Sequence, residues 1–490
     1  MFFEAFIRPA LFRLDPETAH ERALRLAARL GRTKLARDAL EALFCVEDRR
    51  LRHFPQDLPP QTERPGAVGV LSRMAIDFSP LRESRDFRNL WLGQVVSFMG
   101  SEISMVAIPF QMYKLTHSTL AVGLLGLCDL VPLLTLAVLG GSIADALERR
   151  RLLLRTEAAL AVVSAALAGH AFLSHQHPWA LYVLSTISGA LWSLSAPAMR
   201  SLMPRLAREE QLAAASALES VYFNFGAVAG PAVGGLLIAV VGLPGTYLLD
   251  VGSFGASIVA LRALPAIPPS ADAEPAGWRS MLEGFRYVRS KPAILGIFLL
   301  DSNAMVFGMP RALFPALAQQ RFSGGASVVG FLYAAPYAGA LVASLLSGWA
   351  GRVRRQGVAV AIAAAGWGLA LVLFGYATAL WVALVFLALA GAADFVSATL
   401  RTAIMFSASP KSMQGRLAGI ELAQVASAPT LGDVEAGAVA SVTSLRFSIA
   451  SGGIACMVGS ALILLAMPAL RRYDSRDPRS EGVVAAAEAG

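Results

Sequence analysis

Four carboxylic acids interrupt long apolar stretches of this sequence: Glu102, Asp129, Asp301 and Asp394. An ionised side chain inside hydrocarbon is costly, so acids in such segments are functional candidates by default. Here they could carry protons or bind the cationic group of a substrate. A structural role stays open for each acid, and for Asp301 and Asp394 an arginine such as Arg401 could neutralise the charge.

Other polar and aromatic side chains accompany these acids. Gln94, Ser97 and Ser101 share one face of the helix that carries the first acid, because residues three or four apart are neighbours on a helix surface. This face could line a cavity. Trp192 and Tyr337 could stack on an aromatic substrate, although aromatic residues at helical spacing more often serve packing.

A second charged set lies nearer the ends of its apolar segments, where water reaches more easily. Its members are Asp250, Arg311, Asp433 and Glu435. Salt bridges are the favoured interpretation of these residues, and Arg311 is also kept as a candidate for proton or substrate binding.

The composition indicates that most of the chain is surrounded by lipid. Of its 490 residues, 56% are hydrophobic and 16% are charged, which is outside the range of soluble domains. The net charge of +8 is spread between apolar runs, which favours lipid headgroups over nucleic acid as the partner. Cys45, Cys128 and Cys456 stand far apart, so no disulfide, metal site or cofactor is predicted.

Apolar runs long enough to cross hydrocarbon recur along most of the chain. The expected spans are 89–113, 119–141, 151–173, 178–200, 214–240, 246–264, 293–317, 328–350, 357–377, 380–402, 416–441 and 446–469. The sequence therefore predicts an all-α membrane protein with twelve transmembrane helices in two six-helix bundles, 86–265 and 292–470. A cytoplasmic linker, 266–291, joins the bundles, and a cytoplasmic tail, 471–490, follows.

Basic residues predict the orientation, because loops rich in lysine and arginine are retained in the cytoplasm. The loops after even-numbered spans carry most of them: Arg149, Arg150, Arg151, Arg155, Arg205, Arg208, Arg279, Arg286, Arg289, Lys291, Arg352, Arg354, Arg355, Lys411 and Arg416. Both termini are thus expected in the cytoplasm, and the chain in the cell inner membrane.

The first residues differ in kind. Residues 1–54 predict two amphipathic helices on the membrane surface, although packing on another protein surface stays open. A proline-rich linker, 55–85, follows. Arg8–His20 and Val46–Leu51 resemble the membrane anchor of quinone-linked dihydroorotate dehydrogenases, but no catalytic barrel follows them. The resemblance implies an anchor and carries over no flavin, orotate or catalytic residue.

A short motif stands between the second and third spans and includes Gly141, Asp145, Arg149 and Arg150. It is similar to the loop signature of the major facilitator superfamily. The glycine lets helices approach, the acid can meet helix amides, and the arginines can pair with carboxylates. Such a latch would stabilise one access state. Ala146 stands where the family commonly has arginine, which implies a weaker latch, and an ordinary basic loop stays open.

The fifth span carries a second motif of small residues: Gly226, Gly230, Pro231, Gly234 and Gly235. Glycines four apart make a flat helix face, and proline allows a bend. The motif is similar to the one that exporters of the family, mostly proton antiporters, carry in this helix. A generic packing interface is the alternative.

Further segments resemble the enterobactin-exporter-like branch of this superfamily: Glu283–Arg289, Phe331–Pro336 and Gly415–Gly419. With the two motifs, the resemblance covers residues from about 80 to 470. It implies the major facilitator fold and a secondary active transporter that exports a small amphipathic molecule, drug-like or siderophore, by proton antiport with alternating access. The implied partners are the small-molecule substrate, protons and membrane lipid, and the oligomeric state stays open.

Two other classes of function were weighed. A membrane-associated dihydroorotate dehydrogenase, as a remnant or fusion, has the N-terminal resemblance alone in its favour. A scaffold or sensor without transport would lack the intramembrane acids and the gating motifs, and both are present. The sequence therefore favours the exporter and predicts no enzyme activity.

Overall fold

The structure is a computed structural model that describes residues 77–146, 148–265 and 278–474. Contacts divide the chain into two units, Met1–Asp77 and Phe78–Gly490, and the described helices all belong to the second. The amphipathic helices expected in 1–54 and most of the expected linker 55–85 lie outside the described residues.

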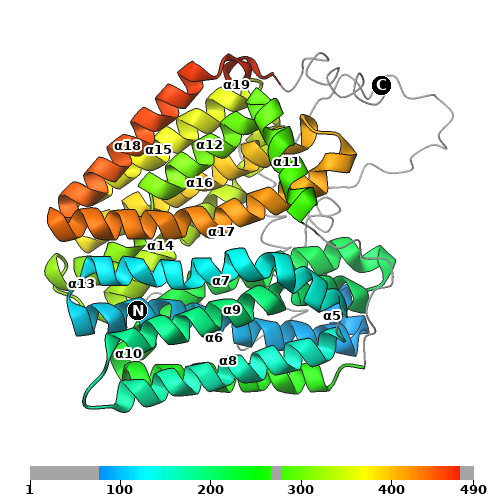
Figure 1. Cartoon of the computed structure of the whole chain (residues 1–490), viewed down its shortest axis with the longest axis vertical. Helices are drawn as coiled ribbons and strands as arrows, with labels where there is room; N and C mark the ends of the chain where they lie inside the picture. The colour runs from blue at the N-terminus through cyan, green and yellow to red at the C-terminus, as the bar shows by residue number, and fades with distance from the viewer. Residues whose placement is uncertain (1–76, 147, 266–277, 475–490) are drawn as a thin grey trace, which may run out of the picture. The chain divides into compact units, whose positions relative to one another are not determined.

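Every regular element in this described part is helical (Figure 1). The long helices are α6 (Arg85–Thr116), α7 (Thr119–Ala146), α8 (Arg149–Phe172), α9 (Pro178–Leu202), α10 (Leu212–Arg262), α12 (Pro292–Phe307), α14 (Ala326–Leu345), α15 (Gln356–Tyr376), α16 (Leu380–Ser407), α17 (Lys411–Val442) and α18 (Leu445–Ala466). The shorter ones are α5 (Ser79–Glu83), η3 (Met203–Leu206), η4 (Glu209–Gln211), α11 (Trp278–Ser290), η5 (Arg311–Leu313), α13 (Phe314–Gln320), η6 (Ser347–Arg352) and α19 (Pro468–Arg472).

Nine helical segments of the described chain are long and apolar enough to cross a membrane. One of them contains α10, whose 51 residues would span about 75 Å, far more than the roughly 30 Å of hydrocarbon. Its one non-helical residue, Gly242, has a φ of 72° that glycine tolerates. Gly230 and Asp250, on either side of it, both reach α6 at Gly100–Glu102, so the chain doubles back at Gly242.

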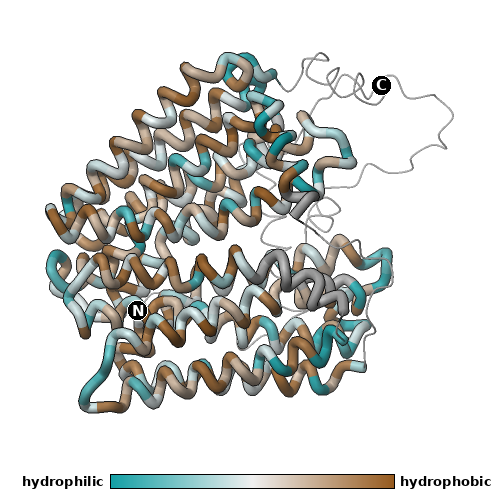
Figure 2. Tube along the Cα trace, in the orientation of Figure 1, coloured by the Kyte–Doolittle hydropathy of each residue, from teal (hydrophilic) through white to brown (hydrophobic). Residues whose placement is uncertain are grey.

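These two arms of α10, together with α7 and α17, bring the crossings to the expected twelve. Figure 2 shows hydrophobic residues along the middle of the helices and hydrophilic residues gathered toward their ends. The helix expected over 293–317 is interrupted between α12 and η5, where Gly308 and Pro310 stand. The segment expected as the linker 266–291 contains α11, whose Val288 is buried while Leu282 and Phe285 are exposed.

Two bundles follow each other along the chain. In the first, α10 packs on α6 and α8, and α7 packs on α9; in the second, α16 packs on α14 and α15, and α12 packs on α17 and α18. Across the two bundles, α10 packs on α14 and α7 packs on α17. The α10–α14 and α7–α17 pairs each join one helix of the first bundle to one helix of the second, as the expected two-bundle plan requires.

Contacts between the bundles concentrate at one end of the helices, which we call the sealed end. A Cβ added at Gly235 would lie 2.5 Å from the carbonyl oxygen of Ala326, at the start of α14. Thr119 Oγ1 donates a hydrogen bond of 2.9 Å to the carbonyl oxygen of Gly437, at the end of α17. The backbones of α10 and α14, and those of α7 and α17, are therefore in close contact at this end.

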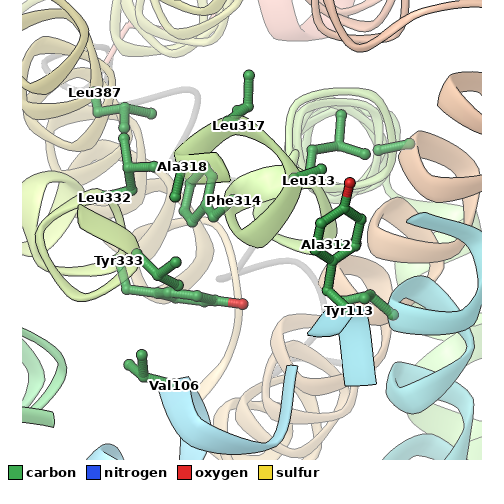
Figure 3. Packing of buried hydrophobic residues seen from close by; sticks show 14 of the residues in the cluster. Val106, Tyr113, Ala312, Leu313, Phe314, Leu317, Ala318, Leu332, Tyr333 and Leu387 are labelled. Atoms are coloured by element: carbon green, nitrogen blue, oxygen red, sulfur yellow. The ribbon is translucent and has the colours of Figure 1, made fainter. Parts of the chain in front are cut away.

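A cluster of buried apolar side chains completes the seal. Figure 3 shows Tyr113 of α6 beside Ala312 and Leu313 of η5, with Phe314 of α13 close by. Gln320 Nε2 donates a hydrogen bond of 2.6 Å to Tyr113 Oη. The first bundle thus contributes an aromatic side chain to the core of the second.

At the opposite end, which we call the open end, the same helices separate. On α7, Val131 and Leu134 are exposed, and on α17, Leu422 and Val425 are exposed. The close α7–α17 approaches of the described chain lie instead at Gly123, Gly126 and Gly437, toward the sealed end. The described contacts between the bundles are therefore unequal at the two ends.

Replacing Gly330 of α14 with leucine should prevent the seal, because a Cβ there would lie 2.3 Å from the Pro231 carbonyl oxygen. In a background without native cysteines, Val106→Cys, fully buried in the seal, should become reactive toward a membrane-impermeant maleimide. Gly366→Leu is the matched control, since its added Cβ would meet only Ala393 Cβ at 3.9 Å. Continued protection of the cysteine in the Gly330 variant would contradict this account of the seal.

Deleting residues 1–76 should leave insertion and thermal stability unchanged, because the helices of Phe78–Gly490 form their own unit. Membrane abundance and the melting temperature of the purified protein, each compared with the full chain, provide the measurement. A truncated protein that aggregates or fails to insert would show that the N-terminal segment is needed for folding.

Candidate functional site

The small residues of α10 bring this helix into direct contact with α6. A Cβ added at Gly226 would lie 2.4 Å from the Phe98 ring, and one at Gly230 would lie 2.4 Å from Glu102 Cβ. Glycine is needed there because any larger side chain would force the two helices apart. The predicted glycine motif of α10 therefore packs directly against the backbone side of Glu102 on α6.

Glu102 is a half-buried acid, one of whose carboxylate oxygens is fully buried without a hydrogen bond. Its Oε2 is inaccessible to solvent and has no hydrogen-bond partner among the described residues. A cation lies within electrostatic range, namely the guanidinium of Arg311, which belongs to the second bundle. A buried carboxylate of this kind costs free energy unless a proton or a cation balances it.

Arg311 is held at the start of η5 by an acid on α17. Its Nη2 donates a hydrogen bond of 2.8 Å to Asp433 Oδ2, and the backbone N–H of Ala312 donates one of 3.0 Å to Asp433 Oδ1. The salt bridge expected for Arg311 and Asp433 is thereby confirmed. Arg311 Nε is buried and has no partner among the described residues, so the cation retains an unused donor.

Asp129 of α7 is the second acid within electrostatic range of Arg311. Its carboxylate is exposed, and its backbone packs against Gly189 of α9, where an added Cβ would lie 3.1 Å from Asp129 Cα. Tyr337 of α14 lies within electrostatic range of both Glu102 and Arg311. Acids from the first bundle and a cation and a phenol from the second therefore face one another, and we call this set the Arg311 cluster.

Trp192 is 51% exposed on α9, and no described contact joins it to the Arg311 cluster. Its expected role in stacking on substrate stays a prediction.

Asp301 and Asp394 belong to a separate group inside the second bundle. Arg401 of α16 donates a hydrogen bond to Asp301 Oδ1, and Gln424 Nε2 donates one of 3.0 Å to Asp301 Oδ2. Asp394 lies within electrostatic range of both Asp301 and Arg401. A void of about 10 Å³ beside this pair is also lined by Glu421. Asp301 thus has the neutralising arginine that the sequence left open.

The sequence did not indicate a third group, which is buried inside the first bundle. Asp250 accepts hydrogen bonds of 2.7 Å from both Ser104 and Ser164, and no salt bridge joins it to another described residue, contrary to the favoured interpretation. Glu157 of α8 accepts a hydrogen bond of 3.3 Å from Ser97. Serines at helical spacing on α6 were the available signal, but spacing alone does not identify the acids that they face.

This group also corrects the expected cavity face of α6. Gln94 is buried and donates a hydrogen bond of 3.3 Å to Ser257 of α10, and Ser101 donates one of 3.2 Å to the Ser97 carbonyl oxygen. The polar face points into the first bundle because two buried acids there require hydrogen-bond donors. Gln94 and Ser97 are therefore engaged inside the first bundle, whereas the half-buried Ser101 stays a prediction as a cavity residue.

The loop motif after the second span is described in part. The surroundings of Gly141 and the side chain of Asp145 lie outside what the structure describes. Arg149 is 4% exposed at the start of α8. Arg150 donates hydrogen bonds of 3.0 and 2.8 Å to the carbonyl oxygens of Leu261 and Arg262, and so caps the end of α10.

Twelve membrane-crossing helices in two bundles, with charged groups meeting between them, define a polytopic membrane transporter. Comparisons with known proteins agree. A family model described as "Transmembrane secretion effector" matches residues 75–487. The enterobactin exporter EntS of Shigella boydii and that of Escherichia coli are each 30% identical over 404 residues, covering 82% of this chain and 97% of the relative.

Solved structures support the same fold. A transporter of the POT family in complex with 5-aminolevulinic acid has a TM-score of 0.64 at 13% identity, covering 79% of this chain and 97% of that chain. A bacterial homologue of the human lysosomal transporter Spinster, inward-facing and unoccupied, has a TM-score of 0.63 at 13% identity, covering 79% and 98%.

The chain belongs to the major facilitator superfamily. Like its relatives, it is a multi-pass transporter of the inner membrane and not an enzyme. The resemblance of the first residues to a dehydrogenase anchor falls outside the described residues.

Arg401→Gln should destabilise the second bundle by roughly 3–5 kcal/mol, because removing one partner of a buried ion pair leaves an uncompensated charge. The melting temperature of the purified protein should fall, and Arg401→Gln combined with Asp301→Asn should recover most of the loss. Arg416→Gln is the control, since its ion pair with Glu283 is partly exposed and is worth about 0–1 kcal/mol. A double variant as unstable as the single one would argue against the pair as the cause.

Proposed function

We propose that this transporter exports a small amphipathic molecule, drug-like or siderophore, in exchange for protons. The observation that carries this proposal is the Glu102 carboxylate, buried with a free oxygen and facing Arg311 of the other bundle. The named cargo of the relatives favours a siderophore among the candidates.

The orientation is part of the proposal. The turns at the open end carry most of the arginines of the described loops: Arg149, Arg150, Arg151, Arg205, Arg208, Arg352, Arg354 and Arg355. By the positive-inside rule, this end faces the cytoplasm and both termini lie there. The described conformation is then inward-facing, ready to receive cargo from the cytoplasm.

The Arg311 cluster suggests how cargo and proton compete. Ionised Glu102 attracts Arg311 across the two bundles, close to the seal, and so holds the empty transporter sealed. Cargo that enters from the cytoplasm and contacts Glu102 or Asp129 weakens this attraction and lets the seal part. Ligand binding can drive such a change only through its different affinity for the two states.

A proton completes the cycle. At the outer side, protonation of Glu102 removes the carboxylate that accepts hydrogen bonds from cargo, so cargo leaves and the neutral transporter returns. Back in the sealed state, Glu102 again faces Arg311, and the proton is released to the cytoplasm. Because the empty, ionised transporter stays locked, the proton gradient is not dissipated without export.

The glycine motif of α10 serves this cycle by letting α6 and α10 move together. Contacts of Gly226 and Gly230 with α6 keep Glu102 in a fixed position within the first bundle. Alternating access then consists of one bundle rocking against the other around the Arg311 cluster.

Glu102→Gln should abolish export driven by an imposed pH gradient, because glutamine keeps the shape and hydrogen bonding of the side chain but cannot exchange a proton. Enterobactin efflux from proteoliposomes is the measurement, and gradient-driven efflux should fall to the level of empty vesicles while exchange without a gradient persists. Asp129→Asn is measured beside it to determine which acid carries the proton.

The control is Glu210→Gln, which removes an exposed acid outside the long helices. Full gradient-driven efflux in both the Glu102 and the Asp129 variants would contradict the proposed coupling and direct attention to Asp301 and Asp394. If enterobactin is not transported at all, growth of a deletion strain on a panel of toxic amphiphiles distinguishes a drug-like cargo from a siderophore.

A further inference from the structure

A cavity of about 620 Å³ opens at the sealed end, on the far side of the seal from the Arg311 cluster. Three turns enclose it: the one between α6 and α7, the one between α13 and α14, and the one between α17 and α18. Its lining includes His117, Thr119, Gln320, Arg321 and Arg446. Its volume is within the range of pockets that hold small molecules.

Arg321 is incompletely satisfied in this cavity. Its Nη1 donates a hydrogen bond to the Gly375 carbonyl oxygen, whereas Nη2 is buried and has no partner among the described residues. Burial lowers the pKa of the Arg321 guanidinium, and the charge of Arg446 acts in the same direction. Two cations therefore repel each other across one cavity, and the lining contains no carboxylate to relieve this repulsion.

Arg446 adds to the positive potential. It is the second residue of α18, where the positive end of the helix dipole disfavours a cation and favours an anion. The guanidinium carbon lies 5.5 Å from the centre of the Tyr376 ring, which orients the side chain.

The segments that connect the long helices at this end supply no compensating acid either. The described residues 117–118, 173–177, 308–325, 377–379 and 443–444, which include η5 and α13, contain no aspartate or glutamate. They contain the basic or titratable residues His117, His175, His177, Arg311 and Arg321. Of these, Arg311 is engaged by Asp433 and does not line the cavity.

We propose that this cavity is an anion-binding site, in which Arg321 and Arg446 together hold the carboxylate or phosphate group of a small molecule. Its assignment to the exit side of the transport path rests on the proposed function, whereas anion binding itself does not. Because guanidinium groups bind such groups through charge-assisted hydrogen bonds, the unused Nη2 of Arg321 is a natural donor to the ligand.

The test is equilibrium binding of salicylate and of inorganic phosphate to the full chain in nanodiscs of neutral phosphatidylcholine. Arg446→Gln should weaken binding about tenfold or more, the usual effect of losing a hydrogen bond between charged groups. Lys114→Gln is the matched control, because it removes an exposed charge from the same end of the bundle without touching the cavity. Arg321→Gln should act like Arg446→Gln, but it also removes the support of the Gly375 carbonyl, so Arg446 carries the test.

Absence of saturable binding of either probe, or equal weakening by the Arg446 and Lys114 variants, would overturn the proposal. Repeating the titration in nanodiscs that contain phosphatidylglycerol separates two sources of the anion. Weaker salicylate binding there by the parent, but not by Arg446→Gln, supports the site with a lipid headgroup as occupant, and unchanged binding supports it with a soluble anion. Since no gradient or transport is involved, failure of this test is distinguishable from failure of the proposed proton coupling.

Discussion

The ion pair between Arg311 and Asp433 is the interaction on which the arrangement between the bundles depends. Asp433 binds both the guanidinium and the Ala312 backbone N–H, so it fixes η5 against α17 and sets where the cation points. Arg311 in turn acts on two acids of the first bundle, Glu102 and Asp129. A single positive charge thus connects helices from both bundles, and a change in its partners is felt on each side.

Small residues make this electrostatic contact effective. Coulomb energies rise as distance and local dielectric fall, so charges influence one another most where helices pack closely and exclude water. The glycines of α10 allow that approach to α6, and those at the sealed end allow it between bundles. Close packing through glycine therefore both closes the sealed end and strengthens the electrostatic interactions between Arg311 and the acids of the first bundle.

The fold was predictable to a large extent because lipid imposes simple rules on length and polarity. Spans, the two-bundle division and the close-packing glycines could be identified from hydropathy and spacing alone. Partners could not. Helical spacing placed Gln94 and Ser97 on one face of α6. It did not show that Glu157 and Asp250 pack against α6 on this side, since those acids are distant in the sequence. Arg311 and Asp433 were expected to form salt bridges, but the electrostatic effect of Arg311 on Glu102 becomes evident only when the two bundles are placed together.

The shortness of the turns at the sealed end has a mechanical consequence. The two arms of α10 are joined at one non-helical residue, Gly242, and only two residues separate α6 from α7 and α17 from α18. Joints this short have no slack with which to absorb sliding between neighbouring helices. Displacement of one helix is therefore passed on to the next, and helices joined so tightly are expected to move together as a stiff unit. If the bundles rock about the Arg311 cluster, as proposed above, a small rotation there becomes a large displacement at the open end.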